Sequence, residues 1–337
     1  MRLGILIEET WDFFQEIYTE LSKHHQTSLF KRRELQLPIF RERVNRYMFH
    51  SDIQSFMRAN DVVFFEWASG LLATGTHFSK RCGIVTRLHR YEMYQWAERI
   101  NWSVVDRVIL VSQAKQREFN MRFPGYAHKS IVVSPSTSLI KFSPRPRRFE
   151  GDIGILCHLT PRKRVYELIL AFYELTKKRD YLRLHIAGGQ DPAYEDYYST
   201  LQYIVRKLGL QDKVIFYGHI TETWDWYHRI DIFISNSYSE GLQVAPMEAM
   251  ASGCYCLAHC WDGADELLPE ENLFFTNGEL QEKILNYCDI LESERQRIRE
   301  HMRTLAVEKF DINQTKTQIR QILEEVGAIS YEKKVNR

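Results

Sequence analysis

Residues 231–253 read DIFISNSYSEGLQVAPMEAMASG, a short apolar strand followed by a turn and a helix. The helix is predicted to begin near Val244 and carries Pro246 in its first turn, where a missing backbone N–H costs little. Free N–H groups at a helix start form an anion site suited to a diphosphate. Glu240 lies just outside this helix, and Glu248 lies about one turn inside it. The stretch therefore places two carboxylates around a predicted phosphate cradle.

Two such carboxylates can each contact a different part of a ligand that carries a diphosphate. One would contact the group attached to the phosphate, and the other would bind a vicinal diol such as a ribose. A structural alternative also fits, in which Glu240 is an acid favoured by the helix dipole and Glu248 is a solvated side chain. The stretch taken alone leaves both interpretations open.

Short apolar strands alternate with amphipathic helices on both sides of this stretch, which is the pattern of an α/β protein with parallel sheets. Strands are predicted at 2–8, 26–30, 61–67, 83–89, 106–112, 129–134, 151–159, 182–189, 213–218, 231–237 and 254–260. Helices are predicted at 11–25, 112–123, 165–175, 245–252, 279–310 and 311–327.

The chain of 337 residues is long enough for two domains, since a domain usually holds about 100–200 residues. The alternation is interrupted at FSPRPRRFEG (142–151), where prolines and arginines together predict a linker. We therefore expect two doubly wound domains, residues 1–145 and 146–310, followed by a C-terminal helical segment at 311–337. Ligands bind beyond the carboxyl ends of strands in open α/β sheets, so the cleft between the domains is the expected site.

The composition is globular, with 44% hydrophobic and 26% charged residues, and it excludes collagen, a disordered chain and a small disulfide scaffold. The formal net charge of +1 hides two halves of opposite sign, because residues 1–150 carry +8 and the remainder −7. No apolar run reaches the roughly 20 residues that cross a bilayer. The start is unlike a signal peptide, since Glu8 and Glu9 follow the first apolar run at once. A cytoplasmic protein is the simplest expectation.

The six cysteines mostly lie among apolar residues, as buried thiols do. One group, Cys254, Cys256, His259 and Cys260, could be interpreted as a zinc cluster. The alternation in CYCLAHC instead favours a strand, whose neighbouring side chains face opposite ways. No Asp-x-Asp flanked by apolar residues is present to hold a divalent ion at a diphosphate, so no metal site is predicted.

Beyond these patterns, the stretch around Glu240 and Glu248 resembles the Glu-(seven residues)-Glu motif of retaining glycosyltransferases of family four. That family has the GT-B fold of two facing Rossmann-like domains with parallel sheets and an interdomain cleft. The resemblance covers most of the second half in the family's order and is weaker in the first half. It is carried by ILCHLTPRKRVYELILAFYEL, LRLHIAGG, KVIFYGHI, WYHRIDIFISNSYSEGL and EAMASGCYCLAHCWDGADEL, and in the first half by DRVILVSQAKQREF. The resemblance implies that the last helix packs back on the N-terminal domain.

Carried over position by position, the resemblance assigns a role to each matching residue. Glu240 would contact the transferred sugar, Lys163 would neutralise the donor diphosphate, and His89 would lie near the donor sugar as the family's active-site histidine does. Glu248 would hold the ribose. The remaining donor-binding residues would be Gly241, Leu242, Gln243, His158, Arg162, Gly218, His219 and Ile220, the last three lining the base pocket.

The sequence departs from the family pattern at a few places. His158 stands where the family usually has arginine, and Arg164 where it usually has glycine. Arg162 or Arg164 could supply the missing positive charge. The glycine-rich turn usual after the first strand is absent, because residues 7–12 read IEETWD. A strand-end histidine such as His89 is also often structural, so both roles remain open for it.

The resemblance implies a retaining glycosyltransferase of the hexosyltransferase type. It would need no metal, would hold no resident cofactor, and would use a nucleotide-diphosphate sugar, most simply a UDP- or GDP-sugar, as co-substrate. The acceptor would be a glycan, a glycolipid or lipid-linked glycan, or another hydroxyl, as in the synthesis of cell-surface polysaccharide or glycoconjugate. Two alternatives remain: a nucleotide-sugar epimerase on the same fold, and a non-catalytic protein that binds a nucleotide-sugar or glycan.

Basic residues of the first half gather in clusters that include Lys31–Arg33, Arg41, Arg43 and Arg46. With the interspersed aromatic residues they could suggest a nucleic-acid surface, but no recognisable nucleic-acid module accompanies them, so no nucleic acid is predicted. The anionic inner face of the plasma membrane is a second candidate partner, since each surface Lys or Arg adds about 1 kcal/mol there. Ordinary solvated helices remain the simplest alternative.

Overall fold

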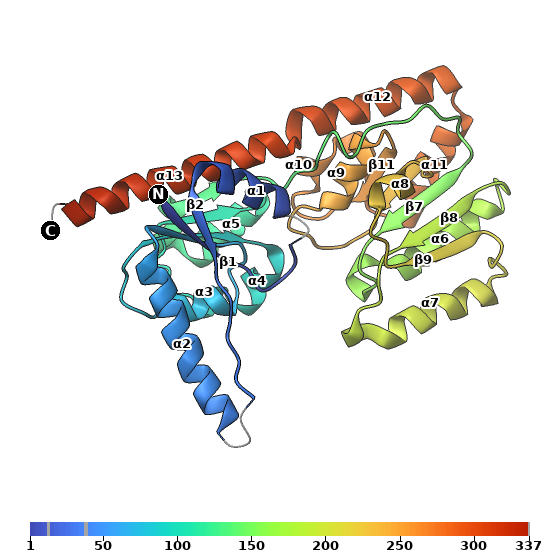
Figure 1. The fold of residues 1–337 in the computed structure, drawn as a ribbon. Helices are drawn as coiled ribbons and strands as arrows, with labels where there is room; N and C mark the ends of the chain where they lie inside the picture. Colours follow the sequence, from blue (N-terminus) through green and yellow to red (C-terminus); the bar gives the residue numbers. More distant parts are fainter. Residues whose placement is uncertain (12–13, 37–39, 336–337) are drawn as a thin grey trace. The chain divides into compact units, whose positions relative to one another are not determined.

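The computed structural model describes residues 1–11, 14–36 and 40–335. The described chain forms two compact units (Figure 1). The N-terminal unit holds residues 1–135 together with the C-terminal helix from Asn313, and the second unit holds residues 136–312. Each unit is built on one sheet of six strands, and every strand pairing in both sheets is parallel. The α/β class predicted from the alternation is confirmed.

The sheet of the N-terminal unit has the order β2-β1-β3-β4-β5-β6. Its strands are β1 (Arg2–Leu6), β2 (Gln26–Leu29), β3 (Val62–Phe65), β4 (Gly83–Leu88), β5 (Arg107–Leu110) and β6 (Ser130–Val132). Its helices are α1 (Gln15–His24), α2 (Arg41–Ala59), α3 (Gly70–Gly75), α4 (Arg90–Gln95), α5 (Gln113–Arg122) and α13 (Ile312–Val335). All six strands lie within the predicted ranges. The part of the predicted helix at residues 12–13 lies outside the described residues.

Helices cover both faces of this sheet. One face packs against α2, α3, α4 and α5 in a single apolar cluster. On the other face, Phe14, just before α1, contacts Phe64 of β3 with ring centroids 5.8 Å apart. The helix α13 passes so close to β4 that a Cβ on Gly83 would lie 2.5 Å from a methyl carbon of Val326. Glycine at position 83 therefore permits the C-terminal helix to pack on this sheet.

The sheet of the second unit has the order β12-β11-β10-β7-β8-β9. Its strands are β7 (Asp152–Leu156), β8 (Arg183–Ala187), β9 (Val214–Gly218), β10 (Ile232–Ser235), β11 (Tyr255–His259) and β12 (Leu273–Phe274). Its α-helices are α6 (Val165–Thr176), α7 (Glu195–Lys207), α8 (Thr223–Tyr227), α9 (Val244–Ala251), α10 (Ala264–Leu267), α11 (Asn277–Asp289) and α12 (Glu292–Lys309). The segment CYCLAHC forms β11, as its alternation predicts.

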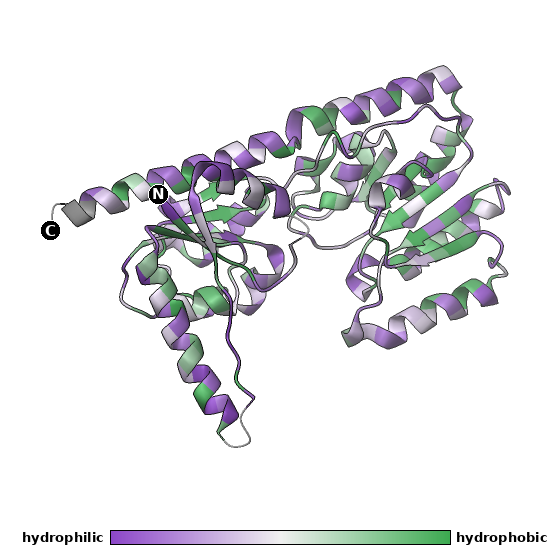
Figure 2. Cartoon of the chain, in the orientation of Figure 1, coloured by the Kyte–Doolittle hydropathy of each residue, from purple (hydrophilic) through white to green (hydrophobic). Residues whose placement is uncertain are grey.

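Apolar residues of the central strands alternate between the two faces of this sheet. Ile232 and Ile234 pack with α6, α7 and α11, whereas Phe233 between them packs with α8, α9 and α12. In Figure 2 the strands of the second unit are mainly apolar, whereas most helices carry both polar and apolar residues. Both faces of the sheet are therefore buried under helices. Polar side chains are accommodated mainly at the ends of the strands.

The proline- and arginine-rich stretch predicted as a linker lies in the second unit. Arg303 of α12 donates hydrogen bonds to the carbonyls of Leu139 and Phe142 at 2.9 and 2.7 Å. Arg147 forms an ion pair with Asp231 at 2.9 Å. These contacts hold residues 139–147 against the second unit, so the compact units divide at Pro135 rather than within the stretch.

Helix α2 was not predicted from the sequence. Its 19 residues are largely polar and bury few apolar side chains, chiefly Ile53 and Met57. A stripe this narrow gives little helical periodicity to detect. None of the helices in the described residues is both long enough and apolar enough to span a membrane.

Candidate functional site

The strand order of the second sheet reverses between β7 and β10, from which the chain proceeds outward in both directions. Loops leaving the carboxyl ends of two such strands diverge and open a crevice, where ligands of doubly wound proteins bind. After β7 the chain runs through the short helix η3 (Pro161–Lys163), and after β10 it runs through residues 236–243 to α9. The residues predicted to bind the donor diphosphate and sugar lie on these two loops.

Glu240 is the centre of this site. Its side chain is 8% exposed, and its Oε1 atom accepts hydrogen bonds from Lys163 Nζ and from Gln243 Nε2, each at 2.7 Å. Arg162 forms an ion pair with the same oxygen. The structure thus brings together four of the residues predicted to bind or react, from two loops 77 residues apart in sequence.

Further hydrogen bonds fix the two loops to each other. Arg162 donates to the Ser239 carbonyl at 2.7 Å, and Asn236 Nδ2 donates to the Arg164 carbonyl at 2.8 Å. Arg164 has a φ of 52°, in the left-handed region that glycine adopts most easily. This observation gives a physical reason for the glycine that the family usually has there. Asn236 was not predicted as a site residue, because a strand-end asparagine gives no separate signal.

The charges of the site keep Glu240 ionised. Burial alone would raise its pKa, but Lys163 and Arg162 outweigh the desolvation, and the net pKa is lowered. One carboxylate therefore faces two permanent cations. The cluster carries an excess positive charge beside the amino end of α9, whose free N–H groups also favour an anion.

Gly218, His219 and Ile220, which were predicted to line a base pocket, lie where β9 ends, next to the end of β8. Gly188 has a φ of 131°, and a Cβ there would lie 1.7 Å from the Cys157 carbonyl oxygen, so only glycine fits. The Gly188 N–H donates to the Gly218 carbonyl at 2.8 Å, and the Leu159 N–H donates to the Gly189 carbonyl at 3.0 Å. These bonds hold the ends of three strands together and leave His158 and His219 exposed beside them.

Glu248 lies on α9, one turn after its start, as predicted. The Tyr227 hydroxyl from α8 lies 2.9 Å from Glu248 Oε2, and burial together with this carboxylate raises the pKa of Tyr227. The same hydroxyl lies 3.0 Å from the Ala245 carbonyl oxygen, so its single proton can be donated to Glu248 or to that carbonyl. It was not predicted as a site residue, since a tyrosine in an aromatic-rich helix is more simply explained as core. Gly241 and Leu242 are buried in the turn before α9.

His89 lies in the N-terminal unit, at the end of β4. Its ring stacks on Trp67 with ring centroids 4.2 Å apart. Burial and the nearby Arg87 lower the pKa of His89 to about 3, so the imidazole is neutral. Arg87 in turn lies 3.2 Å from Glu66, and both side chains are almost completely buried.

Carboxylates gather around His89 that sequence reasoning did not single out. Glu66 follows β3, and burial raises its pKa to about 7 despite Arg87. Glu92 in the first turn of α4 has a pKa raised to about 8 by burial, with Glu9 and Glu66 adding to the effect. The carboxylate oxygens of Glu66 and Glu92 have no hydrogen-bond partner in the described structure. A single buried acid at a strand end, such as Glu66, or in a short helix, such as Glu92, gives no periodic signal in the sequence.

A pocket of about 770 Å³ lies at the same edge of the N-terminal sheet. It is lined by acidic, basic and aromatic side chains, among them Glu8, Glu9, Arg32, Tyr91 and Trp96. Aromatic faces and charged groups of this kind suit a sugar-containing ligand. Within the described ranges, no group of three or more His, Cys, Asp or Glu side chains is placed to hold a metal ion.

Comparison with known proteins finds similarity mainly in the second unit. Residues 142–308 match the family model described as Glycosyl transferases group 1. Curated relatives include the lipopolysaccharide core biosynthesis mannosyltransferase LpsB of Rhizobium meliloti, 37% identical over 68 residues, and mannosylfructose-phosphate synthase of Agrobacterium fabrum, 30% identical over 149 residues. These matches cover 20% and 41% of this chain and 19% and 32% of the relatives. The chain thus spans a third or less of their length.

Solved structures resemble the whole described fold. Anabaena Alr3699/HepE in complex with UDP and glucose has a TM-score of 0.77 at 19% identity, covering 96% of this chain and 99% of its own. Sucrose-phosphate synthase from Thermosynechococcus elongatus has a TM-score of 0.78 at 16% identity, covering 98% and 100%. Together with the two parallel six-stranded sheets, these neighbours confirm the predicted GT-B fold class.

The buried acid beside His89 predicts a pH-dependent stability. The pKa of Glu92 is about 8 in the folded chain and near 4.5 when unfolded, so the folded state binds the extra proton and stability falls as pH rises between these values. We expect Glu92→Gln to leave thermal stability nearly unchanged at pH 5. At pH 9 it should stabilise the protein, by at most about 5 kcal/mol.

Differential scanning calorimetry at both pH values measures this effect. Glu42→Gln, which changes an exposed acid on α2, is the matched control and should alter stability little at either pH. An equal gain for Glu92→Gln at pH 5 and pH 9, or no gain at pH 9, would contradict the assignment of Glu92 as a buried neutral acid.

Proposed function

We propose that this protein is a retaining glycosyltransferase that moves a hexosyl group from a nucleotide-diphosphate sugar to a hydroxyl acceptor. The observation that carries the proposal is the cluster of Glu240, Lys163 and Arg162 at the strand-order reversal of the second sheet. The Glycosyl transferases group 1 match of residues 142–308 supports it. So do solved structures of the same fold that hold UDP or UDP-glucose.

The donor would bind along the carboxyl edge of this sheet. Lys163 and Arg162 would neutralise its diphosphate with the N–H groups of α9, in keeping with the excess positive charge there. An ammonium has three donors, so Lys163 can hold a phosphate oxygen while still contacting Glu240. Glu248, oriented by Tyr227, would accept hydrogen bonds from the ribose hydroxyls. The base would lie by Gly218, His219 and Ile220.

Catalysis would be chiefly electrostatic. Departure of the nucleoside diphosphate leaves negative charge on its terminal phosphate, and fixed cations that already face this point need no reorganisation. Glu240 would hold hydroxyls of the transferred sugar, with the Gly241 and Leu242 amides nearby. His89, neutral because of its lowered pKa, would offer a hydrogen bond to the sugar without adding a charge.

The acceptor is proposed to be a glycan or lipid-linked glycan. Curated relatives support this class by their names, which include lipopolysaccharide core mannosyltransferases and the α-monoglucosyldiacylglycerol synthase of Streptococcus pneumoniae. The aromatic and charged pocket of the N-terminal unit fits a sugar-containing acceptor.

Donor binding and turnover test the proposal directly. The protein is incubated with UDP-, GDP- and ADP-sugars, and binding is measured by thermal shift and nucleotide release by chromatography. We expect one nucleotide class to raise the melting temperature. Lys163→Ala should weaken that binding at least tenfold, because a cation facing the diphosphate is lost. Glu240→Gln should lower turnover by about 10²-fold or more, because it removes a charge that orients the cations.

Matched controls use surface residues of the same unit. Lys178→Ala and Glu282→Gln change exposed side chains and should leave binding and turnover within twofold. Donor binding by the wild-type protein with no transfer to any acceptor would favour a non-catalytic binding protein. Conversion of the free donor to its epimer would favour an epimerase. Absence of binding to all three nucleotide classes would refute the donor site.

Retention of anomeric configuration is a separate prediction. No carboxylate is assigned as a nucleophile opposite the sugar, so we propose attack on the same face as the departing phosphate, which takes the acceptor proton. The product should then have the configuration of the donor. Proton NMR of the isolated glycoside, read from the coupling constant of its new anomeric proton, tests this. A product of the opposite anomer would show an inverting enzyme.

We also propose that the protein acts in the cytoplasm, peripherally at the inner face of the plasma membrane. The support is a basic cluster on α2, formed by exposed Arg41, Arg43 and Arg46 beside exposed Phe40 and Tyr47. Each surface cation adds about 1 kcal/mol of attraction to an anionic leaflet. We expect flotation with phosphatidylglycerol-containing vesicles at low salt and its loss at 0.5 M NaCl.

The flotation test needs a charge-matched control. Replacing the three arginines of the α2 cluster with glutamine should remove most of the floated protein. Replacing Lys178, Arg206 and Lys207, which are exposed in the second unit, should remove little. Equal losses from the two triple variants would indicate a non-specific charge effect, and no flotation of the wild-type protein would exclude membrane attachment.

A further inference from the structure

A second pocket of about 770 Å³ lies in the second unit, at the amino-terminal edge of its sheet. Its walls are residues 144–148 before β7, residues 227–230 before β10, Ser252 and Gly253 before β11, and one side of α12. The donor loops leave the opposite, carboxyl edge of the same sheet. We call this space the arginine pocket.

Five arginines line the arginine pocket, against two glutamates, Glu292 and Glu300. The arginines are Arg145, Arg147, Arg148, Arg299 and Arg303. Such an excess of one charge around a concave space raises the local concentration of ions of the opposite sign. The pocket is therefore suited to an anion.

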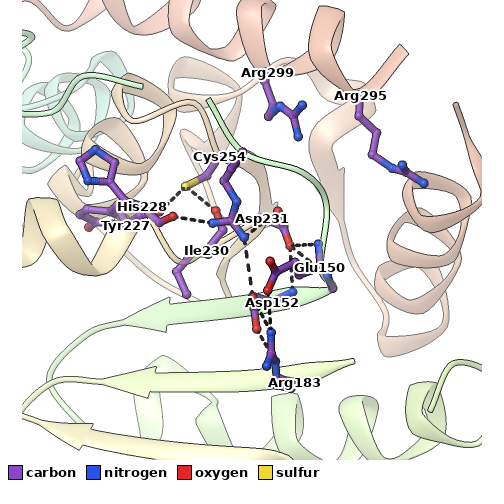
Figure 3. A network of polar contacts seen from close by, with 12 residues as sticks. Glu150, Asp152, Arg183, Tyr227, His228, Ile230, Asp231, Cys254, Arg295 and Arg299 are labelled. Atoms are coloured by element: carbon purple, nitrogen blue, oxygen red, sulfur yellow. Dashed lines mark hydrogen bonds and ion pairs between the residues drawn. The ribbon is translucent and has the colours of Figure 1, made fainter. Parts of the chain in front are cut away.

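Four of these arginines have partners in the protein, since Arg145 forms an ion pair with Asp225 at 3.7 Å and Arg299 forms one with Glu292. Arg303 donates to three backbone carbonyls, those of Leu139, Phe142 and Ala251. Arg147 pairs with Asp231, whose other oxygen accepts the N–H groups of residues 150–152 at 2.9 to 3.0 Å (Figure 3). These bonds hold the residues that line the pocket in place, so these residues lose less conformational entropy when a ligand binds.

Arg299 is not fully satisfied by the protein. It is only 9% exposed, and its Nη2 atom donates to Glu292 and Gln296 at 2.5 and 3.0 Å. Its Nη1 atom is buried and has no hydrogen-bond partner in the described structure. Figure 3 shows the side chain extending from α12 toward the network around Asp231. A buried guanidinium N–H without an acceptor is costly, and a bound anion would remove that cost.

Arg148 supplies a second available donor group. It is exposed at the pocket wall and has no ion pair with any residue of the described ranges. Planar guanidinium groups bind two oxygens of a phosphate through two parallel N–H bonds. The volume lies within the range of small-molecule sites, about 300–1,000 Å³, and exceeds what one phosphate ion fills.

We propose that the arginine pocket is a second binding site, separate from the donor site, for a small molecule that carries a phosphate group. Arg299 and Arg148 contact the phosphate, and the rest of the pocket accommodates the group attached to it. The same chemistry would also hold free inorganic phosphate, so both sources are compared below.

Isothermal titration calorimetry of the full chain tests this site. The Lys163→Ala variant is used throughout, so that phosphate binding at the donor loops is weakened. Inorganic phosphate and glucose 6-phosphate are the probes. We expect one site per chain, with affinity lowered at least tenfold by Arg148→Gln and by Arg299→Gln. The matched control, Arg297→Gln, removes an equal charge from an exposed position of α12 outside the pocket and should change affinity less than twofold.

The Arg148→Gln and Arg299→Gln variants differ in their expected effect on folding. Arg299 is buried, so its variant is checked by thermal unfolding, whereas Arg148 is exposed and its replacement leaves the fold intact. Tighter binding of glucose 6-phosphate than of phosphate would show that the attached group is also held, and equal affinity would assign the site to the phosphate alone. No binding of either probe, or equal weakening by Arg148→Gln and Arg297→Gln, would overturn the proposal.

Discussion

One buried charge, the carboxylate of Glu240, joins the two loops of the candidate site in the second unit. A buried carboxylate is costly unless cations and hydrogen bonds surround it, and Lys163, Arg162 and Gln243 together meet that need. These contacts join the loop after β7 to the loop after β10. Because two cations face one carboxylate, the joined loops keep an excess positive charge in the unliganded protein. The interaction that joins the two loops thus also leaves a positive charge that favours an anionic ligand.

The sequence predicted the strands well, because buried parallel strands form continuous apolar runs such as VVFF of β3 and IFIS of β10. It predicted Lys163, Glu240 and Glu248 as a group only through a family resemblance. No local pattern indicates that Lys163 and Glu240, 77 residues apart, share a hydrogen bond. That contact follows from the strand order, which places β7 beside β10. The strand order of a sheet depends on how helices pack on both of its faces, and it produces no periodic pattern in the sequence.

Two other features were missed for different reasons. Helix α2 was not predicted because it buries few apolar side chains, which is a local property of its sequence. Tyr227 was not predicted because its hydroxyl meets Glu248 only when α8 packs on α9. The stretch FSPRPRRFEG was correctly predicted to break the alternation. Its attachment to the second unit rests on Asp231 and Arg303, which lie far away in the sequence. Composition identifies an irregular segment but not the surface that binds it.

In each half of the chain, the net charge is opposite in sign to the local charge at the carboxyl ends of the central strands, where ligands are expected. The N-terminal half is basic in sum, yet the point where its strand order reverses, between β1 and β3, carries Glu8 and Glu9. The second half is acidic in sum, yet its corresponding point carries Lys163 and Arg162. A diphosphate would be repelled by the first arrangement and attracted by the second. The local charges at the strand ends, rather than the net charge of each half, therefore favour the second unit as the donor-binding one.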